Sequence, residues 1–126
     1  MIKRCEEKEP ELVELTALAS VLHSFYNGIE NIFLVIAKGI DGEKRNGSNW
    51  HKELLVQMRE ANDKRKEIIS EDSKDKIKDY LGFRHFYRHS YSFYLDWKEM
   101  KDLVLSLLDV WNQIKAELND FANSLK

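Results

Sequence analysis

Apolar residues recur at alternating steps of three and four positions in two long stretches of the chain, one near each end. This spacing keeps apolar side chains on one stripe of an α-helix. We therefore predict two long helices, one over 11–39 and one from Trp97 to the end of the sequence. Their predicted inner positions are Leu12, Leu15, Ala19, Leu22, Tyr26, Ile29, Phe33 and Ile36 in the first helix, and Trp97, Met100, Val104, Leu107, Trp111, Ile114, Leu118, Phe121 and Leu125 in the second.

Between the long helices, the pattern predicts a loop and two shorter helices. Gly39 is expected to end the first helix, because glycine accepts the left-handed conformation of a helix C-cap. The polar segment 40–49 contains two glycines and is typical of a loop. The shorter helices are predicted at 50–69 and, after a turn at 70–73, from about Lys74. The predicted fold is an all-α bundle of four to five helices, two of them long, in a single domain over 1–126.

Composition narrows the class of protein. Hydrophobic residues make up 43% of the chain and charged residues 33%, the balance of a globular domain with its own core. The formal net charge of -2 argues against a dedicated duplex-DNA binder, which carries a clear basic excess. Any contact with nucleic acid must therefore use a local patch. A single cysteine, Cys5, cannot form an internal disulfide, and neither a secretory signal nor a long apolar run is visible, so we expect a cytoplasmic protein without membrane contact.

One segment, 81–94, interleaves cations with aromatic rings. It contains two arginines, two histidines and three of the chain's five tyrosines. The arginines are Arg84 and Arg88, and the histidines are His85 and His89. Arginine pairs with phosphate, and aromatic rings stack on unpaired bases. The segment is therefore a candidate contact for RNA.

Within this segment, Arg84, His89 and Tyr91 form the string R-x4-H-x-Y. With this motif the chain resembles the HepT-like proteins of the HEPN superfamily. The lead-in Leu81-Gly82-Phe83 resembles that family too, as do Leu22 to Glu30, Trp50 to Leu55 and Leu95 to Trp97. Three fixed residues alone make a weak motif, but the resemblance spans nearly the whole chain.

The resemblance implies the endoribonuclease toxin of a toxin–antitoxin system. Such a toxin needs no metal or other cofactor and cuts RNA in a cleft shared by the two subunits of a homodimer. Arg84 would hold the scissile phosphate, and His89 would be the general base or acid for attack by the RNA's own 2′-hydroxyl. Tyr91 would be a regulatory site, to which an MntA-like nucleotidyltransferase antitoxin attaches AMP. Arg88 is a candidate second phosphate contact, because a helix places positions 84 and 88 on one face.

The spacing of the two candidate catalytic residues has a geometric consequence. On one regular helix, positions five apart differ by about 140° around the axis, so Arg84 and His89 would not share a face. Either the helix breaks between them, or the site combines residues from two chains.

Other polar residues have simpler interpretations beside functional ones. His85 and His89 have a spacing that can bind metal on a helix, but no carboxylate flanks them, and no metal site is predicted. Asn27, four residues after His23, is either a core amide with a satisfied partner or a residue that faces the cleft and orients His89. Asn27 and His85 are therefore only candidate supporting residues. The charged run 59–67 is interpreted as a solvated helix face.

Two further functions fit the same residues. One is a non-catalytic HEPN protein that binds a nucleotide or a nucleotidyltransferase partner, and the other is a purely structural helical interaction module. Loss of RNA cleavage in both Arg84→Ala and His89→Ala would favour the ribonuclease. AMP transfer to Tyr91 without cleavage would favour the binding protein, and tolerance of substitution at Arg84, His89 and Tyr91 would favour the structural module.

Overall fold

The computed structural model describes residues 11–43, 47–89 and 97–125, with 86–89 described by their helix backbone. This part of the chain forms helix α2 (Leu12–Ile36), a π-helical turn η1 (Ala37–Asp41), and helices α3 (Trp50–Arg59), α4 (Glu71–His89) and α5 (Trp97–Ser124). The predicted all-α fold with two long helices is confirmed. None of the described helices is long and apolar enough to cross a membrane.

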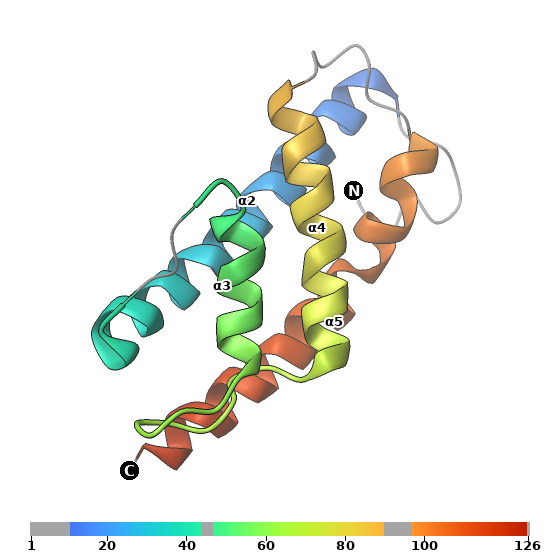
Figure 1. The fold of residues 1–126 in the computed structure, drawn as a ribbon. Helices are drawn as coiled ribbons and strands as arrows, with labels where there is room; N and C mark the ends of the chain where they lie inside the picture. Colours follow the sequence, from blue (N-terminus) through green and yellow to red (C-terminus); the bar gives the residue numbers. More distant parts are fainter. Residues whose placement is uncertain (1–10, 44–46, 90–96, 126) are drawn as a thin grey trace.

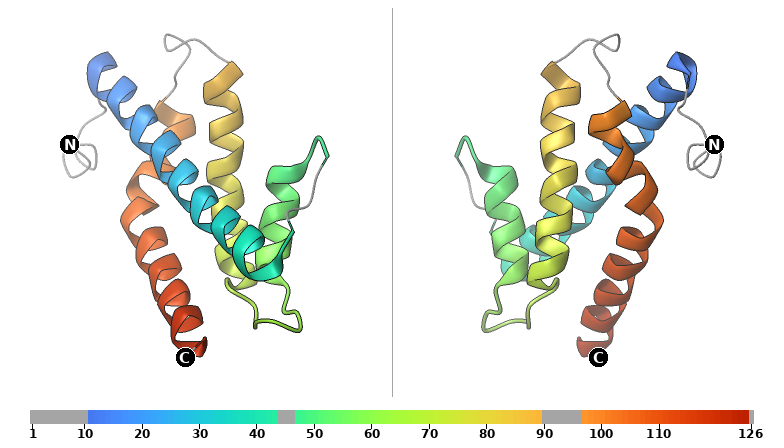
Figure 2. Two further views of the ribbon diagram at one scale, coloured as in Figure 1. Left: turned by 90° about the vertical axis from the view of Figure 1, so that its left-hand side faces the viewer. Right: turned by 90° about the vertical axis from the view of Figure 1, so that its right-hand side faces the viewer.

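Helices α2 and α4 each pack against all three of the other described helices. Helices α3 and α4 run antiparallel beside each other, while α2 and α5 cross them obliquely (Figures 1 and 2). The Tyr80 hydroxyl donates a hydrogen bond of 2.7 Å to the Leu103 carbonyl and so ties α4 to α5. The ring of Phe25 from α2 meets Tyr80 edge-on, with 5.0 Å between centroids. The core therefore includes the region where α2, α4 and α5 meet, and it extends to the buried face of α3.

The predicted apolar stripes of the long helices are largely buried, with exceptions at their ends. Leu12 and Leu125 are 63% and 51% exposed, while Val110, which the pattern misses, is buried. The α-helical part of the first helix ends earlier than predicted, and Gly39 lies inside the π-helical turn. The left-handed residue that closes the turn is Gly42, with φ of 80°, a conformation that suits glycine.

The second helix is much shorter than the predicted 50–69 and ends at Arg59. The chain then folds back on the helix, since the Met58 carbonyl accepts hydrogen bonds from the amides of Ile68 and Ile69 at 2.9 and 3.4 Å. Both isoleucines are buried. Their burial therefore comes from a returning loop and not from a continued helical stripe.

Most of the charged run 59–67 is exposed, as its charge pattern suggests, but it follows the end of α3 as a loop, and Arg65 is buried in an ion pair. The side chains of Arg65 and Asp41 are 1% and 5% exposed, and two hydrogen bonds of 2.7 Å join the guanidinium to the carboxylate. Gln57 and Asn62 donate to the same carboxylate at 2.7 and 3.0 Å. Burial alone would raise the pKa of Asp41, but these hydrogen bonds outweigh burial and lower it.

Helix α4 begins at Glu71, three residues earlier than predicted, because a carboxylate from α5 clamps its first turn. Glu117 accepts hydrogen bonds from the Ser70 amide at 2.9 Å and from the Ser73 hydroxyl at 2.9 Å. The Ser70 hydroxyl caps the helix by accepting a 3.1 Å hydrogen bond from the Ser73 amide. The clamp fixes the lower end of α4, and with it the direction in which the upper end projects.

Candidate active site at the end of helix α4

Arg84 lies on the side of α4 that faces α2. Its Nε donates a hydrogen bond of 2.8 Å to Oδ1 of Asn27, and its guanidinium carbon lies 5.8 Å from the ring centroid of Tyr26. Asn27 also contacts Nε2 of His23 at 3.0 Å. Asn27 therefore holds the motif arginine directly. The prediction that Asn27 orients His89 concerns a side chain outside the described part of the chain.

A buried carboxylate lies next to this contact on α2. Oε2 of Glu30 accepts a 2.7 Å hydrogen bond from the Tyr26 hydroxyl and lies 2.6 Å from Nδ1 of His51 on α3. Burial, together with the bond to Glu30, raises the pKa of Tyr26, so that its hydroxyl remains a donor. The arrangement joins the first turn of α3 to α2 and fixes the His51 ring.

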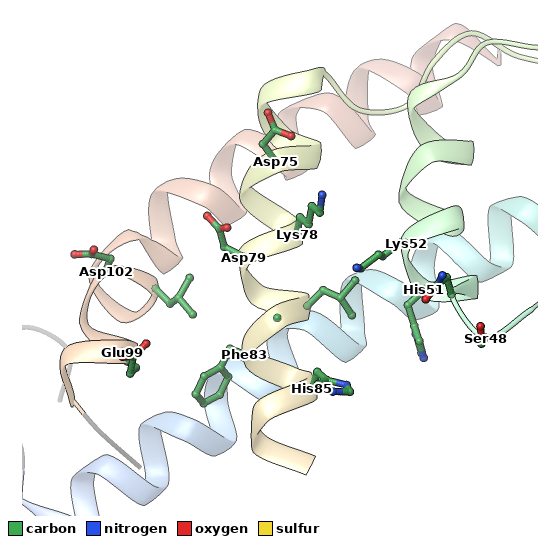
Figure 3. Close-up of a pocket in the computed structure, with 14 residues that line it drawn as sticks. Ser48, His51, Lys52, Asp75, Lys78, Asp79, Phe83, His85, Glu99 and Asp102 are labelled. Atoms are coloured by element: carbon green, nitrogen blue, oxygen red, sulfur yellow. The ribbon is translucent and has the colours of Figure 1, made fainter. Parts of the chain in front are cut away.

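A groove of about 1270 Å³ runs over α4 and is bordered by the first turns of α3 and α5. Its two sides differ in charge (Figure 3). The side between α4 and α3, which we call the lysine side, carries Lys52, Lys78, His51 and His85, with one carboxylate, Asp75, at its end. The side toward α5, which we call the acidic side, carries Asp79, Glu99 and Asp102.

The groove-lining residues of α4 on the lysine side repeat at steps of three and four. They are Asp75, Lys78, Gly82 and His85, so they form one stripe along the helix. The next position in this register is 89. The backbone of α4 is helical through His89, so the motif histidine occupies a position that continues the groove-lining stripe.

The continuous helix excludes one of the two geometric alternatives that the sequence left open. A break between Arg84 and His89 is wrong, because both belong to α4. Their positions therefore differ by about 140° around the helix axis. Position 84 faces α2, whereas position 89 follows the stripe of the groove.

The other predicted site residues are placed as follows. His85 lines the groove. The side chains of Arg88 and His89 are outside the described part of the chain, as are Cys5 and Tyr91. Among the described residues, no group of three His, Cys, Asp or Glu side chains could hold a metal ion.

Sequence reasoning missed the roles of Glu30, His51 and the two groove lysines. A signal for Glu30 was present, because this carboxylate follows Tyr26 by four positions and precedes Phe33 by three, within the apolar stripe of α2. A charge at a core position requires a polar partner. The identity of that partner depends on the packing of α3, which the pattern does not reveal.

The chain is similar to a known protein family over most of its length. A family model described as HepT-like protein matches residues 17–125. The matched region contains Arg84, His89 and Tyr91, together with all the residues of the groove. No curated protein and no solved structure matches the chain significantly.

Proposed function

The chain belongs to the HepT-like family, and on this premise we propose that it is the endoribonuclease toxin of a toxin–antitoxin pair, cleaving RNA in the cytoplasm as a homodimer. The observation that carries the proposal is the placement of Arg84. The motif arginine is half-buried and held by Asn27 at 2.8 Å through Nε alone. Within the described residues its terminal nitrogens make no hydrogen bond, so the forked end of the guanidinium is available to a phosphate.

The proposed reaction is an internal transesterification. His89 removes the proton from the 2′-hydroxyl, the 2′-oxygen forms a bond to phosphorus, and the bond from phosphorus to the 5′-oxygen breaks. The departing 5′-oxygen takes up a proton from water, and His89 returns the proton that it removed to the solvent. The products are a 2′,3′-cyclic phosphate and a 5′-hydroxyl. Arg84 stabilises the charge that develops on the non-bridging oxygens, and Arg88, one helical turn further on, is the proposed second phosphate contact.

A homodimer can bring Arg84 and His89 together at one site. Since positions 84 and 89 lie on different faces of a single helix, we propose that a second source provides one of the two groups. A second copy, related by a twofold axis, supplies it and creates two equivalent sites. We propose that each site combines Arg84 of one subunit with His89 of the other.

Cleavage of RNA in the presence of EDTA tests this function. The wild-type dimer, checked by mass to be free of AMP, is expected to cleave single-stranded RNA and leave cyclic-phosphate ends, while the all-deoxy strand survives. The deoxy strand is the matched control because it lacks only the nucleophile. Absence of cleavage on several classes of RNA by a folded, unmodified dimer would favour the non-catalytic HEPN protein that binds a nucleotide or a nucleotidyltransferase partner.

Tyr91 is the proposed control point of the toxin. The antitoxin, an MntA-like nucleotidyltransferase, would join the Tyr91 oxygen to the α-phosphate of ATP and release pyrophosphate. The added phosphate and bulk next to His89 would repel RNA. Incubation with antitoxin and ATP is expected to add the mass of AMP to the wild type and to abolish cleavage. Tyr91→Phe should gain no mass and stay active, whereas Tyr94→Phe, three residues further on, should behave as the wild type; modification of Tyr91→Phe would place the control site elsewhere.

A further inference from the structure

The two lysines on the lysine side of the groove differ from most of their neighbours in lacking acidic partners. Lys74 and Lys76, on the first turns of α4, form ion pairs with Glu71 and Asp72 at 2.8 and 2.9 Å. Lys52 and Lys78 are exposed and make no ion pair within the described residues. They come from two different helices and border the same groove (Figure 3). Among the described residues, these two charges therefore have no ion-pair partner and face the solvent of the groove.

The histidine beside them is held in a fixed orientation. His51 Nδ1 is engaged by the buried Glu30 at 2.6 Å, which directs the opposite edge of the ring, with Nε2, away from the carboxylate. The His51 side chain is 24% exposed and lines the groove. A ring fixed in this way presents one nitrogen to a ligand without the entropy cost of ordering a mobile side chain.

The floor between these groups is unobstructed. Gly82 lies on the stripe between Lys78 and His85, and a Cβ built there meets no atom within 4 Å. The backbone of the groove is thus open to close approach by a ligand. From Lys78 to His89 the stripe extends over about 16 Å, a length that accommodates more than one phosphate.

We propose that the lysine side is the track along which the RNA backbone runs to the scissile phosphate. Lys52, Lys78 and His51 bind the phosphates that precede or follow it, and the stripe delivers the strand to position 89. The carboxylates of the acidic side repel phosphate and restrict the strand to a single path. This inference rests on the proposed function in taking RNA as the ligand.

The track predicts that two lysines contribute strongly to RNA affinity and little to the chemical step. The full-length dimer is titrated against a fluorescent, single-stranded 2′-O-methyl RNA, which cannot be cleaved by 2′-hydroxyl attack. Lys52→Ala with Lys78→Ala is expected to weaken binding by about 10-fold or more, and to reduce the slope of log K against log salt by about 0.7 for each lysine. The control is Lys38→Ala with Lys115→Ala, which removes the same charge from exposed lysines outside the groove. Equal affinity and slope in the two double variants would overturn the track.

Two substitutions of Gly82 give a second test that leaves the lysines in place. Gly82→Ala fits the open floor and favours the helix, so it should bind RNA within about 2-fold of the wild type. Gly82→Glu places a carboxylate between Lys78 and His85 and should weaken binding by about 10-fold or more. Wild-type affinity in Gly82→Glu would also overturn the track.

Cleavage of ordinary RNA separates this inference from the proposed function. If the proposed track is correct, Lys52→Ala with Lys78→Ala raises KM and leaves kcat near the wild-type value. RNA binding through the lysine side with no cleavage by the wild type would retain the track and refute the nuclease. Cleavage with the same KM in both lysine double variants would retain the nuclease and refute the track.

Discussion

Alanine in place of Arg84 or His89 is expected to lower kcat for RNA cleavage by about 10²- to 10⁴-fold. In the proposed mechanism, His89→Ala removes the group that transfers the proton, and Arg84→Ala removes charge stabilisation from the transition state. Neither change should prevent folding, because Arg84 is only half-buried and His89 lies at the last residue of α4. Single-turnover cleavage in EDTA, with helix content and Tm measured in parallel, checks the expectation.

Variants around Arg84 separate charge from geometry. Arg84→Lys keeps the charge but loses both the forked donor set and the Nε that binds Asn27, so its activity should stay low. Asn27→Asp retains an acceptor for Nε and should keep more activity than Asn27→Ala. A lysine variant as fast as the wild type would contradict the forked phosphate contact and reduce the role of Arg84 to a nearby positive charge.

Loss of the buried ion pair should produce the largest effect on stability. Arg65→Met leaves the Asp41 carboxylate buried without its main partner and is expected to lower the free energy of unfolding by about 3–5 kcal/mol. That is a large share of the roughly 5–15 kcal/mol typical of a domain. The matched control is Arg59→Met, which removes an exposed ion pair to Glu71 and should cost about 1 kcal/mol or less. Urea denaturation followed by circular dichroism measures both, and equal losses would contradict a special role for the buried pair.

The same ion pair is expected to affect the stability of the protein in acid. The pKa of Asp41 is lower in the folded protein than the usual value of 3.8, so the unfolded state binds a proton first as pH falls. The stabilisation is complete above the unfolded pKa and disappears as pH falls through the folded one. As pH falls from about 5 to the point at which the protein unfolds, the free energy of unfolding should therefore decrease less in Arg65→Met than in the wild type. The difference should be about the contribution of Asp41 to stability. Identical acid profiles would show that Asp41 contributes nothing to this dependence.

The sequence predicts the long helices well because their burial depends on local spacing. The stripes of α2 and α5 are long enough to identify a helix before any partner is known. The same spacing is misleading after Arg59, where Ile68 continues the register but is buried by a loop. That loop is held by Arg65, whose partner Asp41 lies 24 residues away, and by Asn62, whose side-chain oxygen accepts the amides of the next turn at 2.8 and 3.1 Å. The turn formed by the Asn62 side chain could be predicted from the local sequence. The ion pair between Arg65 and Asp41 could not.

The candidate site likewise combines features that the sequence reveals with features that only the fold reveals. The motif residues are contiguous in the sequence and can be recognised there. The contacts of Arg84 with Asn27 and of Glu30 with His51 join residues 57 and 21 positions apart, so they depend on how α2 meets α4 and α3. The different charges of the two sides of the groove likewise arise only when α3 and α5 are placed on either side of α4. A function can thus be proposed from local pattern, whereas the contacts that position each group can be found only from the fold.

Mixed dimers test most directly the claim that each active site combines two subunits. Arg84→Ala and His89→Ala chains are co-expressed with different tags, and the mixed dimer is purified and assayed for RNA cleavage. One of its two sites then lacks both groups and the other is intact, so we predict about half of the wild-type activity per dimer, far above either parent. A mixed dimer as inactive as its parents would mean that both groups act from one chain, and would contradict the composite site.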